Sequence, residues 1–595
     1  MSNIITEIVG SIPVIADYLK KINLIKNIDT LVRPLRSNNR RLSHGETCFV
    51  MILYLLCRPH VMYRVEDWVA DTTYLKALFP KIQPKHFNDD RLGDTFKALQ
   101  ETGIRNIFSQ NSMSIIKEFK LSTDQVHCDF TNFTVQGNYD NEEQEDTITI
   151  TYGFSKAHRP DKKQFAQEVA VTSDGGVPIL SQSLNGNTAD VTRYIPLWRD
   201  IQNLMGSSDF LTVADCKLSS EENLLTIAKG DGYFLAPLAM YSTLQDELKK
   251  YIVENNETHT KLIQRKKGDK IISYHGFEKP ATLVDEETNK EYTYRKIFVK
   301  SSQLEETKSK TIDRHINSAI EEIELVISRL NSYKSLNTVE KIRNKIESIL
   351  NYNKVKGLIH YQIEEKVSTI KKQVGRGRPG LNTVYEDVEI KEQNLKYNID
   401  KKAIDNKKEL SGYFVLITNK PKDELPMKQA LNSYKQEWKV EKIFSRLKGP
   451  LQVVPIFLQL PEHIEAMLFL LMICAQIFTL MDREAEKSLA KNNEKLAGLF
   501  PNNIEVARPK AELMLDAFKN IGLVYRITDD DIDVDISALN QLQGKIIEIT
   551  NVNPIGYNND YIKQKLETKE IKINLKKKFQ KRVDFNMLLQ SKEKR

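Results

Sequence analysis

The chain has 595 residues, of which 40% are hydrophobic, 8% aromatic and 28% charged, and this composition excludes a tail, a coiled coil and a disordered polypeptide. At roughly 150 residues per domain, the length predicts a globular protein of about four structural units. The 87 Lys and Arg residues stand against 80 Asp and Glu residues. The resulting net charge of +7 indicates a polyanionic partner only if the positive residues are clustered.

The cysteines and the apolar segments exclude further classes of protein. The five cysteines are too widely spaced for a zinc finger and too few for a disulfide framework. The N-terminal MSNIITEIVG lacks the basic flank and continuous apolar run of a signal peptide, so we expect a cytoplasmic, reducing location. The apolar run 466–481 falls short of the roughly 18 to 20 residues that a membrane span needs. We therefore expect a buried core helix there and no membrane contact.

Residues 1–120 follow helical spacing. Ser43 and Glu46 form a capping-box pattern before an apolar run, which predicts that a helix begins there. The connection before this helix carries a basic cluster, for which a solvated loop is the favoured interpretation and phosphate contact is the alternative. The cluster consists of Arg33, Arg36, Arg40 and Arg41.

Residues 121–240 change to short β-rich runs separated by turns. The runs QVHCDFTNFTV, TITITYGF, QEVAVTS and VPILSQSL predict an antiparallel meander. A helix over 192–204 then leads to a strand over 210–214, and Asp215 follows this strand. Strands followed by a helix and a further strand predict a mixed α/β sheet.

Between residues 241 and 405 the chain is strongly charged and leaves the sheet pattern, which predicts a β-rich and partly helical insertion. Within it, GRGRPG at 375–380 is too short and too basic for regular structure. A flexible linker is the favoured interpretation. The alternative is that Arg376 and Arg378 enter the minor groove of DNA.

The α/β pattern returns over residues 406–490, with a strand at 412–419 and a long helix over about 428–447. Residues 491–595 are expected to form a C-terminal basic region. Its basic run at 576–582 suits either a solvated face or an arm that faces DNA.

Three acids on different elements are candidates for chemistry. Asp129 lies inside a strand-like run in which His127, Asp129 and Thr131 share a face. Burying a charge costs free energy, so an acid in the interior of a strand indicates a specific role. Asp215 follows an apolar strand, at the carboxyl end where open α/β sheets place their sites. Glu441 lies on the long helix. Judged singly, each acid is more typical of a cap or a surface charge, and only the fold can bring the three together.

Carboxylates without His or Cys ligands suit hard divalent cations such as Mg²⁺ or Mn²⁺. Two such ions, about 3.5–4 Å apart, activate the attacking oxygen and stabilise the leaving oxygen of an in-line displacement at phosphorus. The long helix favours this interpretation, because Tyr434, Glu437, Glu441 and Lys448 are spaced so that they share one side. Tyr and Lys side chains beside a metal ligand would supply phosphate contacts, whereas an ordinary amphipathic helix explains the same periodicity.

At these residues the chain resembles the DDE transposases of bacterial insertion sequences, in the IS-four-like superfamily marked by a Tyr-x2-Arg-x3-Glu-x6-Lys signature. Four further blocks look like those of its long-chain branch, and the likeness covers most of the chain. The blocks are YGFSKAHRPDKKQ (152–164), LNGNTAD (184–190), VADCKLSS (213–220) and PIFLQLPEHIEA (455–466).

The resemblance implies an RNase H-like fold in which Asp129, Asp215 and Glu441 are the catalytic triad and bind two Mg²⁺ or Mn²⁺ ions. It implies that Tyr434 and Lys448 contact DNA near the cut. The expected activity is cleavage at the terminal inverted repeats of a mobile element, followed by attack of the freed 3′-hydroxyl on target DNA. We expect residues 1–120 to bind the repeats, and at least a dimer to assemble across two ends.

One position departs from the signature. Glu437 stands where the signature has Arg, so an anion replaces a phosphate-binding cation. Two alternatives therefore stay open beside the transposase: a metal-dependent nuclease without strand transfer, and a DNA-binding protein that has lost catalysis, with Glu437 as its first sign.

Other residues have a structural and a functional interpretation. Trp438 is expected to pack against the sheet, or alternatively to stack on an extruded base, and Trp68 is expected in the core. His127 is expected to be satisfied by a neighbour, while His158 is a candidate phosphate contact beside Arg159. The sequence has no phosphate-binding loop, nucleophile elbow or dinucleotide fingerprint, so no motif supports nucleotide hydrolysis, acyl transfer or hydride transfer.

Overall fold

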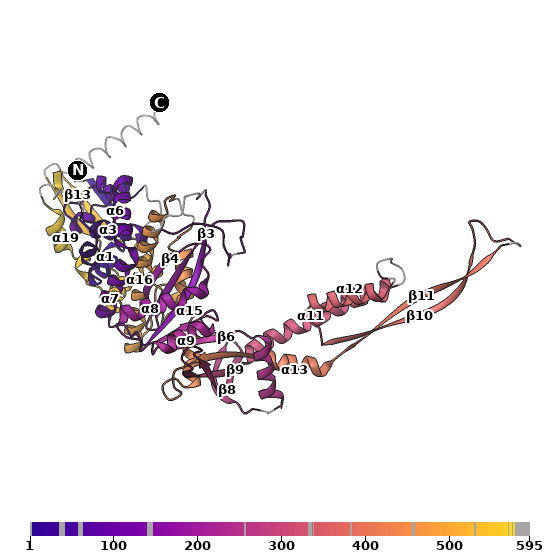
Figure 1. Cartoon of the computed structure of the whole chain (residues 1–595). Coiled ribbons are helices and arrows are strands. Elements are labelled where there is room, and N and C mark those ends of the chain that lie inside the picture. The colour runs from indigo at the N-terminus through magenta and orange to yellow at the C-terminus, as the bar shows by residue number, and fades with distance from the viewer. Residues whose placement is uncertain are drawn as a thin grey trace. The chain divides into compact units, whose positions relative to one another are not determined.

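In the computed structural model the chain divides into two compact units (Figure 1). Unit 1 comprises Met1–Ala236 and Asn432–Arg595, and unit 2 comprises Pro237–Leu431. Unit 2 is longer than the insertion expected at 241–405, because the segment after residue 405 packs with the insertion. The structure describes residues 3–34, 42–57, 64–137, 139, 147–156, 158–254, 257–330, 336, 338–380, 383–454, 458–528, 531–568, 571–573 and 575–576. Arg36, Arg40 and Arg41 lie outside these ranges.

The sheet of unit 1 is mixed, as the sequence predicts. Its strands follow the order β4-β3-β2-β5-β6. β2, β3 and β4 are antiparallel to one another, whereas β5 is parallel to both β2 and β6. The bounds are β2 (Gln125–Thr134), β3 (Gln164–Thr172), β4 (Pro178–Leu184), β5 (Leu211–Ala214) and β6 (Tyr233–Leu238).

The prediction of one strand of the meander is wrong. The run TITITYGF forms only an isolated bridge, between Thr151 and Gln164. Two further hydrogen bonds join its backbone to a loop, since Gly186 N–H donates to the Thr149 carbonyl at 3.0 Å and Thr149 N–H donates to the Asn185 side chain at 2.8 Å. A chain that crosses a loop in this way cannot form a regular strand ladder.

Helices surround this sheet, and the expected ones are present. The capping box at Ser43 is formed, with Glu46 N–H donating to Ser43 Oγ at 3.1 Å and Ser43 N–H donating to Glu46 at 2.9 Å. Trp68 is buried, as expected. The helices of unit 1 that precede residue 237 are α1 (Ile12–Lys21), α2 (Leu24–Leu31), α3 (His44–Cys57), α4 (Val65–Asp71), α5 (Leu75–Leu78), α6 (Asp89–Thr102), α7 (Ile104–Phe119), α8 (Tyr194–Met205) and α9 (Glu221–Lys229).

The core of unit 1 is built around α16 (Pro461–Asn492). This helix is longer than the expected run 466–481, and by length and composition alone it is apolar enough to cross a membrane. Its most apolar 18-residue window is 89% buried inside the protein, which is the burial of a core helix. The polar Gln476 is satisfied there, because it accepts from Asn111 at 2.9 Å and donates to the Pro178 carbonyl at 2.8 Å.

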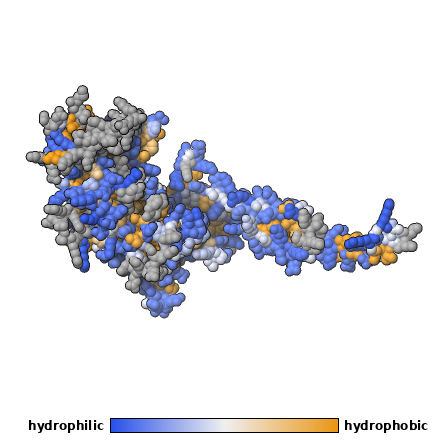
Figure 2. Space-filling model, turned by 90° about the horizontal axis from the view of Figure 1, so that it is seen from above, coloured by the Kyte–Doolittle hydropathy of each residue, from blue (hydrophilic) through white to orange (hydrophobic). Residues whose placement is uncertain are grey.

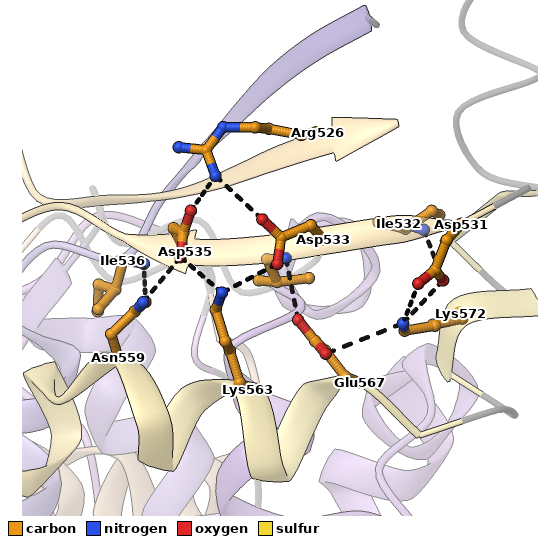
Figure 3. Close-up of polar contacts among 11 residues, drawn as sticks. Arg526, Asp531, Ile532, Asp533, Asp535, Ile536, Asn559, Lys563, Glu567 and Lys572 are labelled. Carbon is orange, nitrogen blue, oxygen red and sulfur yellow. Dashed lines mark hydrogen bonds and ion pairs between the residues drawn. The ribbon is translucent and has the colours of Figure 1, made fainter. Parts of the chain in front are cut away.

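The two ends of the chain meet in a small antiparallel sheet, in which β1 (Asn3–Ile8) pairs with β13 (Gly522–Ile527) and β13 with β14 (Ile532–Ile536). Its charges are paired, since Arg526 and Lys563 both contact Asp533 at 3.0 Å and also contact Asp535 (Figure 3). The described C-terminal region is therefore folded and packed with the N-terminal helices. Its helices are α17 (Ala511–Asp516), α18 (Gln541–Ile549) and α19 (Asn559–Leu566). Of the basic run 576–582, only Lys576 is described.

The long helix expected over 428–447 is broken into α14 (Met427–Tyr434) and α15 (Trp438–Lys448). The break has a backbone cause. Hydrogen bonds to the third preceding residue replace those to the fourth, as in the bond from Glu437 N–H to the Tyr434 carbonyl at 3.1 Å. This tighter winding changes which side chains of the signature share a face.

Within unit 2, four strands are antiparallel neighbours in the order β12-β9-β8-β7, and β10 and β11 form a separate two-stranded hairpin. Helices α11 and α12 pack together over the base of the hairpin. The elements are α10 (Ser242–Lys249), β7 (Thr260–Lys267), β8 (Lys270–Val284), β9 (Glu291–Ser301), α11 (Ser302–Arg329), α12 (Val339–Tyr352), β10 (Ile359–Gln373), β11 (Tyr385–Ile399), α13 (Lys401–Ser411) and β12 (Tyr413–Thr418).

The segment GRGRPG lies at the tip of the β10–β11 hairpin, where Arg376 and Arg378 are exposed. It is a connection between two paired strands, since Gln373 pairs with Tyr385 and the register continues to Ile359 and Ile399. The hairpin also exposes apolar side chains, which Figure 2 shows as hydrophobic patches near its end. They include Val367, Ile370, Val374, Val384 and Tyr385.

Candidate active site

The fold places the two aspartates side by side. On the neighbouring parallel strands β2 and β5, Cys128 is paired with Ala214, and Asp129 and Asp215 are the next residues along the two strands. Asp215 therefore lies at the carboxyl end of β5, where open α/β sheets gather functional side chains, and Asp129 lies inside β2 at the point where the pairing with β5 ends. The sequence predicts an acid inside one strand and an acid after another, and the register of the sheet adds that the two positions coincide.

Each aspartate is held by local contacts. Asp129 Oδ1 accepts a hydrogen bond from the backbone N–H of Phe130 at 2.7 Å. Asp215 Oδ1 accepts from the Tyr194 hydroxyl of α8 at 2.6 Å and from the Lys217 N–H at 2.9 Å. The Tyr194 ring also packs edge-on against Phe130, with 5.0 Å between ring centroids. Tyr194 thus ties the two strand ends to each other.

The helix α15 and the turn before it bring further carboxylates to this point. Burial and the charges of Asp129, Asp215 and Glu441 raise the pKa of Glu437 to about 7. Burial also raises the pKa of Asp129 to about 6, and Asp215 adds to this increase. Carboxylates perturb one another in this way only when they are close in space. The fold therefore brings the three predicted acids within electrostatic reach of Glu437.

The tyrosine and lysine of the signature also lie here. Burial raises the pKa of Tyr434 to about 12, with contributions from Glu437, Cys216, Asp215 and Glu441. Lys448 donates to Thr131 Oγ1 at 2.7 Å, and its charge lies close enough to interact with Asp129. Tyr434, the last residue of α14, and Lys448, the last residue of α15, therefore both lie within electrostatic reach of the carboxylates.

Sequence reasoning missed a second cation at the site. Lys156 donates to the Phe130 carbonyl at 2.7 Å and pairs with Asp190 at 2.9 Å. Burial raises the pKa of Asp129 and the charge of Lys156 opposes this rise, whereas burial and then Lys156 lower the pKa of Lys448, so both lysines lie within electrostatic reach of the same aspartate. The signal was available, because Lys156 and Asp190 lie in two of the blocks that carry the family resemblance.

Other expected contacts are not part of this cluster. Trp438 does not pack into the core, since 47% of its surface is exposed. It lines a groove of about 520 Å³ with Lys439, Lys442, Lys487 and Arg508, beside the turn that joins β3 to β4. This groove borders α15, but neither Asp129 nor Asp215 lines it. Arg376 and Arg378 belong to unit 2.

The two histidines differ from each other. His127 is fully buried, and neither of its ring nitrogens has a hydrogen-bond partner among the described residues, so the expectation of a satisfying neighbour is wrong. Burial, with a contribution from Lys439, lowers the pKa of His127 to about 3. A neutral imidazole is compatible with this site under α15. His158 is exposed, with a positive φ of 55°.

The donor set fits a hard divalent cation, because the gathered ligands are carboxylate oxygens without sulfur. Within the described residues, no three His, Cys, Asp or Glu side chains lie close enough to one another to form a complete metal site. The acids are thus neighbours whose side chains would have to turn toward a shared ion. Like charges separate such side chains when no cation lies between them.

The pH dependence of stability provides a test of this crowding. Because the pKa of Glu437 is raised from 4.5 to about 7, the folded state loses stability as pH rises through this window. In metal-free buffer, Glu437→Gln is expected to be more stable than wild type at pH 8 by on the order of 1–2 kcal/mol, and equal to it at pH 4. Thermal unfolding at both pH values measures the difference. A Glu437→Gln curve that shifts with pH as the wild type does would contradict the crowding.

Carboxylates that meet on neighbouring strands of a mixed α/β sheet are typical of metal-dependent enzymes that act on phosphate esters. This is the class of protein that the fold and the site indicate. The chain belongs to the DDE transposase family, because the family model described as "Transposase DDE domain" matches residues 124–477. This range contains all three predicted acids. The family is dependent on divalent metal ions. A second family model, "Domain of unknown function (DUF4277)", matches residues 4–113.

The other comparisons add little. A search of curated proteins gives no match. Six chains of known structure are similar. One of them is the piggyBac transposase in a synaptic complex with hairpin DNA, which is 11% identical, with a TM-score of 0.25. The match covers 44% of this chain and 58% of that chain, so it spans less than two thirds of the known protein.

Proposed function

We propose that the protein is a DDE transposase that cleaves DNA at the ends of a mobile element and joins these ends to target DNA. The observation that carries this proposal is the register of β2 and β5, which sets Asp129 beside Asp215 within the matched domain. The strand order β4-β3-β2-β5-β6 supports an RNase H-like core. The blocks and the signature further support membership of the IS-four-like superfamily of bacterial insertion sequences.

Asp129, Asp215 and Glu441 are the residues that would hold the metal ions, Mg²⁺ or Mn²⁺. When bound, two such ions supply an activated oxygen nucleophile and neutralise charge at the phosphorus. Tyr194 keeps Asp215 oriented by its hydrogen bond of 2.6 Å. Because burial raises the pKa of Asp129 to about 6, a cation would have to displace a proton from this residue below that pH, whereas a solvated aspartate has already lost it.

The scissile phosphate fits beside the two lysines. Lys156 and Lys448 both interact with Asp129, so a phosphodiester next to this aspartate would be contacted by two ammonium groups. Tyr434 would add a hydroxyl contact. We propose that the exposed Trp438 stacks on an unpaired base, and that Arg376 and Arg378 bind the DNA backbone or minor groove from the tip of the hairpin.

The remaining partners follow from the reaction. Two element ends have to be held together for joining, so we propose at least a dimer on DNA, with residues 1–120 contacting the terminal inverted repeats. A protein that acts on bacterial DNA in this way would work in the cytoplasm, on the nucleoid.

The experiment is cleavage of labelled DNA that carries the two ends flanking the coding region. Wild-type protein in Mg²⁺ or Mn²⁺ is expected to cut at the ends and to give joined products, whereas Glu441→Gln is expected to bind the ends without cutting. Cutting without joined products would favour the nuclease. Binding without any cutting would favour a DNA-binding protein that has lost catalysis.

A further inference from the structure

Glu437 occupies the most enclosed position of any carboxylate that α15 and its preceding turn contribute to the site. It directly precedes the first residue of α15 and lies one turn before Glu441. Glu437 is half-buried, whereas Glu441 is exposed. Glu437 lies in the tighter turn at 435–437, which ends where α15 begins, whereas Glu441 lies in the regular part of α15.

The charge at Glu437 is not balanced by protein. Among the described residues, no hydrogen-bond donor and no cation contacts its side-chain carboxylate, and its electrostatic neighbours are Asp129, Asp215, Glu441, Tyr434 and Cys216. The nearest lysines of the site are engaged elsewhere. Lys156 binds Asp190 and a backbone carbonyl, and Lys448 binds Thr131.

A half-buried carboxylate among three other carboxylates is costly unless a cation joins them. The family signature has a cation at this position to bind phosphate, and here the side chain has the opposite charge. An anion beside the reacting phosphate would repel it, unless this anion instead contributes to holding a positive ion. A carboxylate in this position is therefore suited to contact a cation.

We propose that Glu437 is a ligand of the divalent cation held by Asp129 and Asp215, in addition to Glu441. This inference rests on the proposed function, since it adds a carboxylate to the same site. The departure from the signature then marks a changed ligand set in an active enzyme, and the phosphate contact of the missing arginine falls to Lys156 and Lys448.

The test is Mn²⁺ binding to the full-length protein, measured by calorimetric titration at pH 8 without DNA. Glu437→Gln is expected to weaken Mn²⁺ binding at least about tenfold, as removal of groups that hold a metal does. Glu437→Arg is expected to weaken it further, because it adds a positive charge. Glu437→Asp keeps the carboxylate and is expected to retain part of the affinity.

Glu118→Gln is the matched control, because Glu118 is an exposed acid on α7 outside the site. It is expected to bind Mn²⁺ as wild type does. The proposal is overturned if Glu437→Gln keeps wild-type affinity while Asp129→Asn loses it, and this result would leave the transposase function standing. Wild-type protein that takes up no Mn²⁺ would also overturn it. Cleavage by Glu437→Arg at or above the wild-type rate would also overturn the proposal. It would show that arginine functions at this position and that Glu437 is a harmful replacement of it.

Discussion

Replacement of Asp129 by Asn is expected to reduce DNA cleavage on the order of a thousandfold, because the site loses a charge that holds the cations stabilising the reacting phosphate. Asp215→Asn is expected to have the same effect, since the register of β2 and β5 makes the two acids equivalent neighbours. Binding of the end DNA should persist in both variants. The measurements are initial cleavage rates in Mg²⁺ and a mobility-shift titration.

Asp209→Asn provides the control, since Asp209 is exposed and lies before the opposite end of β5. Its cleavage rate should equal that of the wild type. Thermal unfolding should show no loss of stability for Asp129→Asn, because burial already favours the protonated form of this side chain. If Asp129→Asn cleaves normally, Asp129 is not part of the catalytic group. If it loses both cleavage and folding, the loss of activity has a structural cause.

Arg446→Met is expected to give the largest loss of stability. Arg446 lies on α15 and is buried, with 3% of its side chain exposed. Its guanidinium donates to Asp482 of α16 at 2.7 Å and to the two carboxylate oxygens of Glu512 at 2.9 and 3.1 Å. Removing one partner of such a network leaves uncompensated buried charge, which costs about 3–5 kcal/mol. The melting temperature should fall by several degrees, and cleavage should fall with it because α15 carries Glu441.

Arg508→Met is the matched control, because it removes an arginine of the same unit that is exposed and not buried. Arg508 is 75% exposed and pairs with Glu486 at 2.8 Å, and exposed pairs of this kind contribute about 0–1 kcal/mol. Its melting temperature should therefore stay near that of the wild type. Equal losses for Arg446→Met and Arg508→Met would show that the buried network does not anchor α15.

The two candidate aspartates could be singled out from the sequence because their signals are local. Asp129 interrupts an apolar strand and Asp215 ends one, so each is conspicuous within about ten residues of chain. The position of the two aspartates beside each other could not be predicted from local signals. It depends on β5 lying parallel to β2, although two strands and a helix separate them in the chain, and no spacing of residues encodes this register.

The details of the helix could not be predicted in the same way. Periodicity predicts one continuous helix over 428–447, whereas the backbone winds more tightly between Tyr434 and Val440. Propensity does not record such a change, because tertiary contacts decide it. The inward position of Glu437 and the exposure of Trp438 both depend on this break, and both differ from the expectations for a regular amphipathic helix.

Three further features could not be predicted because they depend on contacts between segments that are far apart in the sequence. The run TITITYGF alternates as a strand does, but it lies against the loop at Asn185 and Gly186. The last hundred residues look like a basic appendage by charge, yet β13 pairs with β1 at the opposite end of the chain. Lys156 illustrates the same point at the site, since only the fold brings it beside Asp129.

Strand transfer is the reaction that separates a transposase from every alternative. The measurement is joining of a labelled, pre-cleaved element end with a free 3′-hydroxyl to a supercoiled plasmid in Mg²⁺, with Asp215→Asn alongside the wild type. A covalent product that carries the label, formed by the wild type and absent with Asp215→Asn, is the predicted result. A plasmid that is nicked without gaining the label, or a labelled product that Asp215→Asn also forms, would contradict a transposase that acts through this carboxylate site.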